Sequence, residues 1–157
     1  MKKMQLIPYR DVILVKKSTS VWGVVVKWFL HSEYLHSEYV VDDWLTFGTD
    51  LSRPANVHPF GYRRGSIDIY RYRYDISKNQ QQIIMEELQK ATALQYDWRE
   101  ALCIGLGFKC RGKDRRYICI SVILQAMEKA GMLPADIRKN YQDFSVFTDT
   151  HYFGKVL

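Results

Sequence analysis

The stretch that most constrains the fold is HSEYVVDDWLTFGTD, residues 36–50. Aliphatic and aromatic residues lie on both sides of the polar pair Asp42-Asp43, and such residues favour extended backbone. Two runs of this kind joined by a short polar turn are typical of a β-hairpin. We therefore expect two antiparallel strands here, with His36 opening the first of them.

Two further stretches predict strands. Residues 11–17, DVILVKK, have the apolar character of a short strand. Residues 67–75, IDIYRYRYD, alternate strictly, which puts the isoleucines and arginines on one side and the first aspartate and the tyrosines on the other. The intervening residues 52–66 contain two prolines and two glycines, which predicts a long surface loop carrying His58.

Later segments have the apolar spacing of helices. Four segments are predicted to be helical: 21–32, 79–93, 96–108 and 117–131. Ser20 is placed to cap the start of the first and Ser77 to open the second. Gly131 is placed to close the last. The buried stripe of the second is expected to comprise Ile83, Ile84, Leu88 and Ala91. Because strands come first and helices later, we expect an α+β fold, a small antiparallel β-sheet packed against helices, in a single domain over residues 1–157.

The composition argues against several classes of protein. Hydrophobic residues make up 47% of the chain and charged residues 25%, as in an ordinary globular protein. The net charge is +6, but the basic residues are scattered apart from a cluster at 109–116, so we expect no nucleic-acid binding. No run reaches transmembrane length. The N-terminal apolar run is interrupted by Pro8, Arg10 and Asp11, so we expect no signal peptide, a cytoplasmic location and reduced thiols.

Of the three cysteines, Cys119 has the sequence environment that is expected of a nucleophile. It lies in the first turn of a predicted helix, directly after the basic cluster, and free N–H groups at a helix start favour thiolate over thiol. Cys103 lies mid-helix, where core packing is expected, and Cys110 lacks the helix start. The competing interpretation of Cys119 is a small buried apolar residue, so a catalytic role requires a base nearby.

The sequence offers a base in the repeated tetrapeptide HSEYLHSEY, residues 31–39. His31 and His36 are five residues apart, so they do not share a face of a helix or a strand, and at most one belongs to a given site. His36 opens a strand and is the candidate base. The hairpin brings Thr49 and Asp50 opposite it. Asp50 is the first choice for the residue that orients the ring, and Thr49 and Glu38 are the alternatives. Glu38 ranks lower because we expect its side chain to point away from His36 along the chain.

Together these residues resemble a known family. WFLHSEYLHSEYVVDD and the later run ALQYDWREALCIGLGF…RRYICISVILQAMEKAG are similar to circularly permuted papain-like enzymes, the NlpC-type cysteine amidase or peptidase group that includes YiiX-like proteins and phage-encoded relatives. The resemblance spans residues 10–138, and the histidine precedes the cysteine, the reverse of ordinary papain. The resemblance implies a circularly permuted papain-like arrangement. Because the family has phage-encoded members, a phage is one source from which the chain could come.

The resemblance also implies roles for individual residues. Cys119 matches the nucleophile, His36 the base, and the stretch containing Thr49 and Asp50 the third, polar position. Tyr96 and Asp97 match a motif near the cleft that contacts substrate or supports the scaffold. The chain departs from the family pattern at two places. It has Cys119-Ile120-Ser121 in place of Cys-Ser-Glu, and Leu35 in place of a serine or threonine spacer. These departures point to an altered substrate or an inactive site.

The sequence therefore predicts a cysteine hydrolase or acyltransferase that cleaves an amide or ester bond. The resemblance implies a peptide-, peptidoglycan- or acyl-type substrate as the partner, and we expect no cofactor and no metal. The alternative is a catalytically inactive binding or structural accessory protein on the same fold, for example in a phage.

Overall fold

The computed structural model describes residues 5–16, 33–50, 53–60, 66–92, 94–96, 116–117, 119–140 and 144–157. The strands in these ranges are β1 (Asp11–Val15), β2 (His36–Asp42), β3 (Leu45–Asp50), β4 (Arg53–Pro59), β5 (Ile67–Tyr72), β6 (Gln95–Tyr96), β7 (Arg116–Tyr117) and β8 (Phe153–Lys155). The helices are α2 (Lys78–Ala91), α4 (Cys119–Lys129), α5 (Ile137–Asn140) and α6 (Ser145–Thr148).

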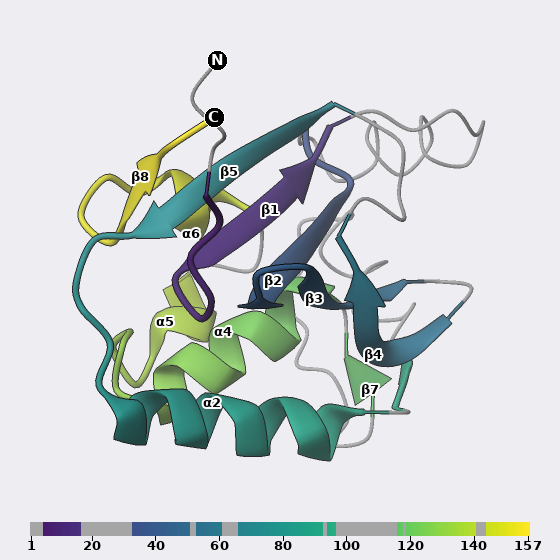
Figure 1. Cartoon of the computed structure of the whole chain (residues 1–157). Helices are drawn as coiled ribbons and strands as arrows, with labels where there is room; N and C mark the ends of the chain where they lie inside the picture. Colours follow the sequence, from purple (N-terminus) through teal and green to yellow (C-terminus); the bar gives the residue numbers. More distant parts are fainter. Residues whose placement is uncertain are drawn as a thin grey trace.

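Six strands form one sheet in the order β4-β3-β2-β1-β5-β8, and every neighbouring pair in it is antiparallel. Helices α2 and α4 pack against each other below this sheet (Figure 1). The short strands β6 and β7 form a separate parallel pair. The predicted α+β class is confirmed.

The predicted hairpin is present as β2 and β3, with Tyr39 opposite Phe47 and a register shift between Val40 and Asp42. Strand β1 pairs with β2 on one side and with β5 on the other. The hairpin and the alternating strand thus belong to one sheet because β1 joins them. This shared sheet is the arrangement that the order of elements led us to expect.

The predicted loop over residues 52–66 is wrong in its first half. Arg53–Pro59 forms β4, an edge strand that pairs with β3. Proline has no N–H to donate, but an edge strand needs only one set of ladder bonds, so it tolerates Pro54 and Pro59. His58 accordingly lies in a strand, opposite Thr46.

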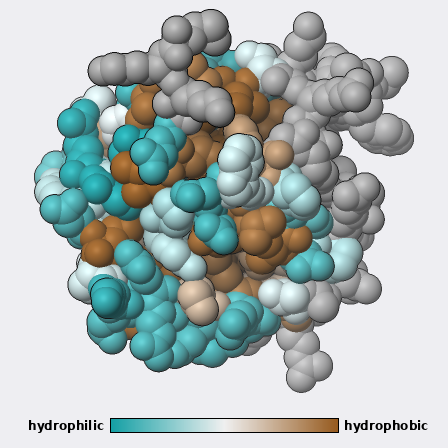
Figure 2. All heavy atoms as spheres, viewed as in Figure 1, coloured by the Kyte–Doolittle hydropathy of each residue, from teal (hydrophilic) through white to brown (hydrophobic). Residues whose placement is uncertain are grey.

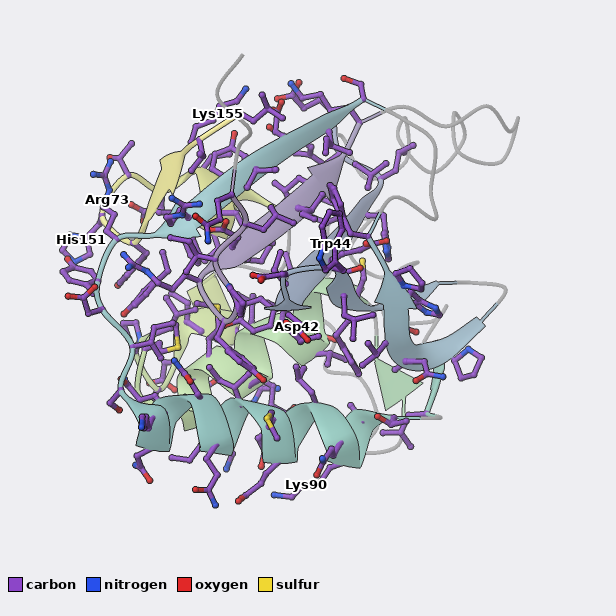
Figure 3. The ribbon with its side chains drawn as sticks, viewed as in Figure 1. Asp42, Trp44, Arg73, Lys90, His151 and Lys155 are labelled. Carbon is purple, nitrogen blue, oxygen red and sulfur yellow. The ribbon has the colours of Figure 1, made fainter. Side chains whose placement is uncertain are left out.

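Helix α2 begins as predicted. The Ser77 side chain accepts a hydrogen bond from the backbone of Gln80, and the Gln80 side chain accepts one from the backbone of Ser77, a capping box. Ile84, Leu88 and Ala91 are buried. The opposite face of the helix is mostly hydrophilic (Figure 2), and Lys90 points away from the sheet (Figure 3).

Helix α4 forms the centre of the core. Seven of its residues are buried: Cys119, Ile120, Val122, Ile123, Leu124, Ala126 and Met127. They belong to one cluster with Tyr39 and Phe47 of the hairpin and with the buried side of α2. Gly131 follows the helix with a φ of 67°, the left-handed conformation that closes helices and favours glycine. This packing fixes the start of α4 against the sheet.

Some predictions fall outside the described residues. They are the helices over 21–32 and most of 96–108, Cys103, Cys110, His31, Asp97 and the basic residues before Arg116. Among the helices that the structure does describe, none is both long enough and apolar enough to cross a bilayer.

Candidate active site

Cys119 and His36 meet where a helix begins and a strand begins. Cys119 is the first residue of α4 and His36 the first of β2, and these two elements pack together. The His36 ring hydrogen-bonds the Cys119 thiol. Cys119 is 5% exposed and His36 4% exposed, so little water separates or screens the pair. The two residues that the sequence singled out as nucleophile and base are in contact.

The surroundings of Cys119 favour its thiolate. Burial by itself raises the pKa of the thiol, but the charge and hydrogen bond of His36 lower it, as does a hydrogen bond from the backbone of Ser37. The net effect is a Cys119 pKa below the ordinary value. A cysteine buried only among apolar groups has a raised pKa instead.

Glu38 lies next to the imidazole of His36. Its Oε1 is 3.4 Å from His36 Nε2, and both side chains are buried. Our expectation that Glu38 points away from His36 is wrong. Residues i and i+2 share a face of a strand, and a glutamate side chain is long enough to fold back over that spacing. The carboxylate is therefore placed to orient the ring and to stabilise its protonated form.

The structure describes less of the other two candidates for the third position. Asp50 pairs with Arg53 at the end of β3, and its side chain lies outside the described atoms. Thr49 is buried on β3. Glu38 is thus the described acidic group with a measured contact to the ring.

Two residues of β3 complete the site and were missed from the sequence. Thr46 Oγ1 donates a hydrogen bond of 2.7 Å to Glu38 Oε2. Gly48 lies so close that a Cβ there would be 3.2 Å from His36 Nε2 and 3.3 Å from Glu38 Cγ. The alternation of β3 holds the signal, since residues 46 and 48 share a face, but the hairpin register was needed to show which residues they oppose.

The remaining candidates are only partly described or lie outside the described residues. Tyr96 lies in β6, where its backbone pairs with Tyr117, just before α4; β6 also packs near β3 and β4. Asp97 and His31 fall outside the described residues. His151 is exposed at the periphery of the fold near Arg73 (Figure 3).

Comparison with known proteins places the fold. No protein-family model matches the chain, and no curated protein matches it. The metalloprotein YiiX from Escherichia coli O157:H7 is a solved structure with the same fold: the TM-score is 0.68, the identity is 15%, and the match covers 96% of each chain. The chain therefore has a YiiX-like fold. In the part of this chain that the structure describes, no group of three or more His, Cys, Asp or Glu side chains is arranged to hold a metal ion.

Proposed function

We propose that this chain is a thiol-dependent hydrolase or acyltransferase on a circularly permuted papain-like fold. The observation that supports this most directly is the contact of Cys119 with His36, which lowers the pKa of a buried thiol. Burial alone has the opposite effect. The direction of the shift thus favours a nucleophile over a cysteine that only fills space.

In the proposed reaction, the Cys119 thiolate attacks the carbonyl carbon of an amide or ester. The protonated His36 ring gives its proton to the leaving nitrogen or oxygen, the C–N or C–O bond breaks, and a thioester of Cys119 remains. Water then loses a proton to His36 as it attacks the thioester carbon, and the acid leaves as the thiol regains a proton. An alcohol or amine in place of water makes the same step an acyl transfer.

The fold supplies two further parts of this mechanism. The first N–H groups of a helix have no partner within the helix, so those at the start of α4 would stabilise negative charge on the carbonyl oxygen. Glu38 would orient the His36 ring and stabilise its positive charge, the role for which Asp50 was the first choice. The catalytic set that we propose is Cys119, His36 and Glu38.

The substrate class rests on the family resemblance. We propose a peptide, a peptidoglycan peptide or a lipid-linked acyl group as the source of the scissile carbonyl. The basic residues at 109–116 would favour an anionic substrate such as cell-wall polymer.

One observation favours the alternative, a binding or structural protein in which this site is catalytically inactive (a silent site). Both members of the Cys119–His36 pair are nearly inaccessible, whereas a nucleophile must reach its substrate. The two functions therefore make opposite predictions for turnover, while both allow an unusual thiol.

The test combines thiol chemistry with turnover. We expect iodoacetamide to alkylate Cys119 with a midpoint pH below the ordinary thiol value of about 8.5, and below those of Cys103 and Cys110, as measured by mass-spectrometric peptide mapping. The midpoint is compared rather than the rate because burial slows the reagent at every pH. Cys119→Ala and His36→Ala should each abolish hydrolysis of a panel of cell-wall peptides and acyl esters, and the double variant should be no worse.

His31→Ala is the matched control, since it changes the same tetrapeptide context and should retain wild-type turnover. Glu38→Gln should reduce turnover less than either dyad variant, because an orienting group forms no bond to the substrate. An inactive His31→Ala beside an active His36→Ala would rule out the proposed base. A depressed midpoint with no turnover on any substrate would favour the silent site.

A further inference from the structure

We propose that β3 is the positioning strand of this site, with Thr46 holding the Glu38 carboxylate in the rotation that presents its second oxygen to His36. The inference deepens the proposed function, because it names what fixes the residue that orients the base. Thr46 and Gly48 contact Glu38 and His36 and not the thiol in any described interaction, so they are positioning residues.

The two oxygens of Glu38 have different partners. Oε2 accepts the 2.7 Å hydrogen bond from Thr46, and Oε1 lies 3.4 Å from His36 Nε2. Fixing one oxygen of a planar carboxylate fixes the direction of the other. The Thr46 hydroxyl has a single proton, and its other acceptor, the His58 carbonyl, is 3.5 Å away, so the proton belongs to Glu38.

The hairpin fixes Thr46 itself. Thr46 pairs with Val40 in β2 and with His58 in β4, so its backbone is held from both sides. Its side chain is fully buried, as is most of Glu38. A buried carboxylate with a hydrogen-bond donor keeps its charge more readily than one without, which preserves the charge that faces the ring.

Gly48 contributes by lacking a side chain. The His36 ring and the Glu38 stem occupy the space next to its Cα, where a Cβ would meet Nε2 at 3.2 Å and Cγ at 3.3 Å. Contacts of this length are tighter than nine in ten real Cβ contacts, so alanine would displace the ring or the carboxylate by a few tenths of an ångström. Thr46 thus aims the carboxylate, and Gly48 leaves room for the ring to meet it.

The experiment measures the pH midpoint of Cys119 alkylation by iodoacetamide in the full chain. In Thr46→Val, which keeps the branched shape and removes the hydroxyl, the ring should be held less firmly, and the midpoint should rise by about one pH unit. Thr46→Ser keeps the hydroxyl and should restore the wild-type midpoint. Thr92→Val, which removes the hydroxyl bound to the Leu88 carbonyl on α2, is the control and should not move it.

A folded Thr46→Val with the wild-type midpoint would overturn the inference, since Thr46 would then only satisfy a buried carboxylate. If Thr46→Val fails to fold, Gly48→Ala tests the same positioning by crowding the His36 ring and the Glu38 stem, and an unchanged midpoint there would overturn the inference equally. Alkylation needs no substrate. A shifted Thr46→Val midpoint, beside a wild-type protein that turns over no substrate, therefore counts against the hydrolase while leaving the positioning role intact.

Discussion

At the scale of single residues, Asp68 shows how this chain holds a buried charge away from the proposed site. Its Oδ2 accepts hydrogen bonds from Lys16 at 2.7 Å, Lys155 at 2.9 Å and the Tyr34 hydroxyl at 2.7 Å. Burial by itself raises the pKa of the carboxyl, but hydrogen bonds from the lysines and the tyrosine lower it to about 2. The carboxylate ties β5 to β8 and to the segments beside β1 and β2.

We expect Asp68→Asn to destabilise the fold by about 1–3 kcal/mol near neutral pH, because it removes a buried charge from three donors. The folded pKa of Asp68 is depressed, so its stabilisation is present above the unfolded value of about 3.9 and is lost as the pH falls towards 2. Urea unfolding of both proteins between pH 7 and pH 2 measures this. The difference between them should shrink across that window.

Asp75→Asn is the control for that comparison. The Asp75 side chain is fully exposed and pairs with Arg10 at 3.1 Å, and exposed pairs contribute little. Equal effects of the two substitutions would mean that the Asp68 cluster is no stronger than a surface ion pair.

At the scale of elements, the ends of two helices are specified by residues close to them in the sequence. Helix α2 begins at the Ser77–Gln80 capping box, and α4 ends before Gly131 in the left-handed conformation. Strand β4 behaves differently, because it became a strand through pairing with β3 in spite of two prolines. The tip of the neighbouring hairpin carries Trp44, which is 76% exposed (Figure 3).

We expect Ser77→Ala to lower the free energy of unfolding by about 1 kcal/mol, because the Gln80 N–H loses its acceptor at the helix start. Ser77→Gly should cost only a few tenths of that, since glycine is a tolerated N-cap. The urea midpoint should fall with an unchanged slope. Equal losses in the two variants would show that the hydroxyl bond does not stabilise α2.

At the scale of the whole molecule, one core joins the helices to the sheet. Ile123 of α4 is fully buried in the cluster that contains Tyr39, Phe47 and Leu88. The same helix presents Cys119 to His36, so packing in the middle of α4 supports the geometry at its first residue.

We expect Ile123→Ala to cost about 2–5 kcal/mol and Ile123→Val about 0.5–1.5 kcal/mol, in proportion to the cavity left behind. Met85→Ala, at a side chain that is 44% exposed on α2, should cost much less. Denaturant unfolding measures all three. A small loss for Ile123→Ala would mean that α4 is not anchored at the centre of this core.

The sequence by itself determined what neighbouring residues can specify. Alternation and turn residues indicated the 36–50 hairpin, a cap and a stripe indicated α2, and the position of Cys119 at a helix start followed from local spacing. The choice of His36 over His31 also followed from spacing together with the family resemblance. These features depend on residues a few positions apart, which is the range over which backbone preference and periodicity act.

The tertiary structure decided which distant residues meet. The register of β2 on β3 brought Thr46 and Gly48 to Glu38, and the packing of α4 on β2 brought Cys119 to His36. The return of Glu38 towards the ring and the pairing of the proline-containing β4 also depend on neighbours that a local pattern does not contain. Cross-strand register and side-chain rotation are set by burial and hydrogen bonding over the whole sheet. They therefore cannot be predicted from the residues of one strand alone.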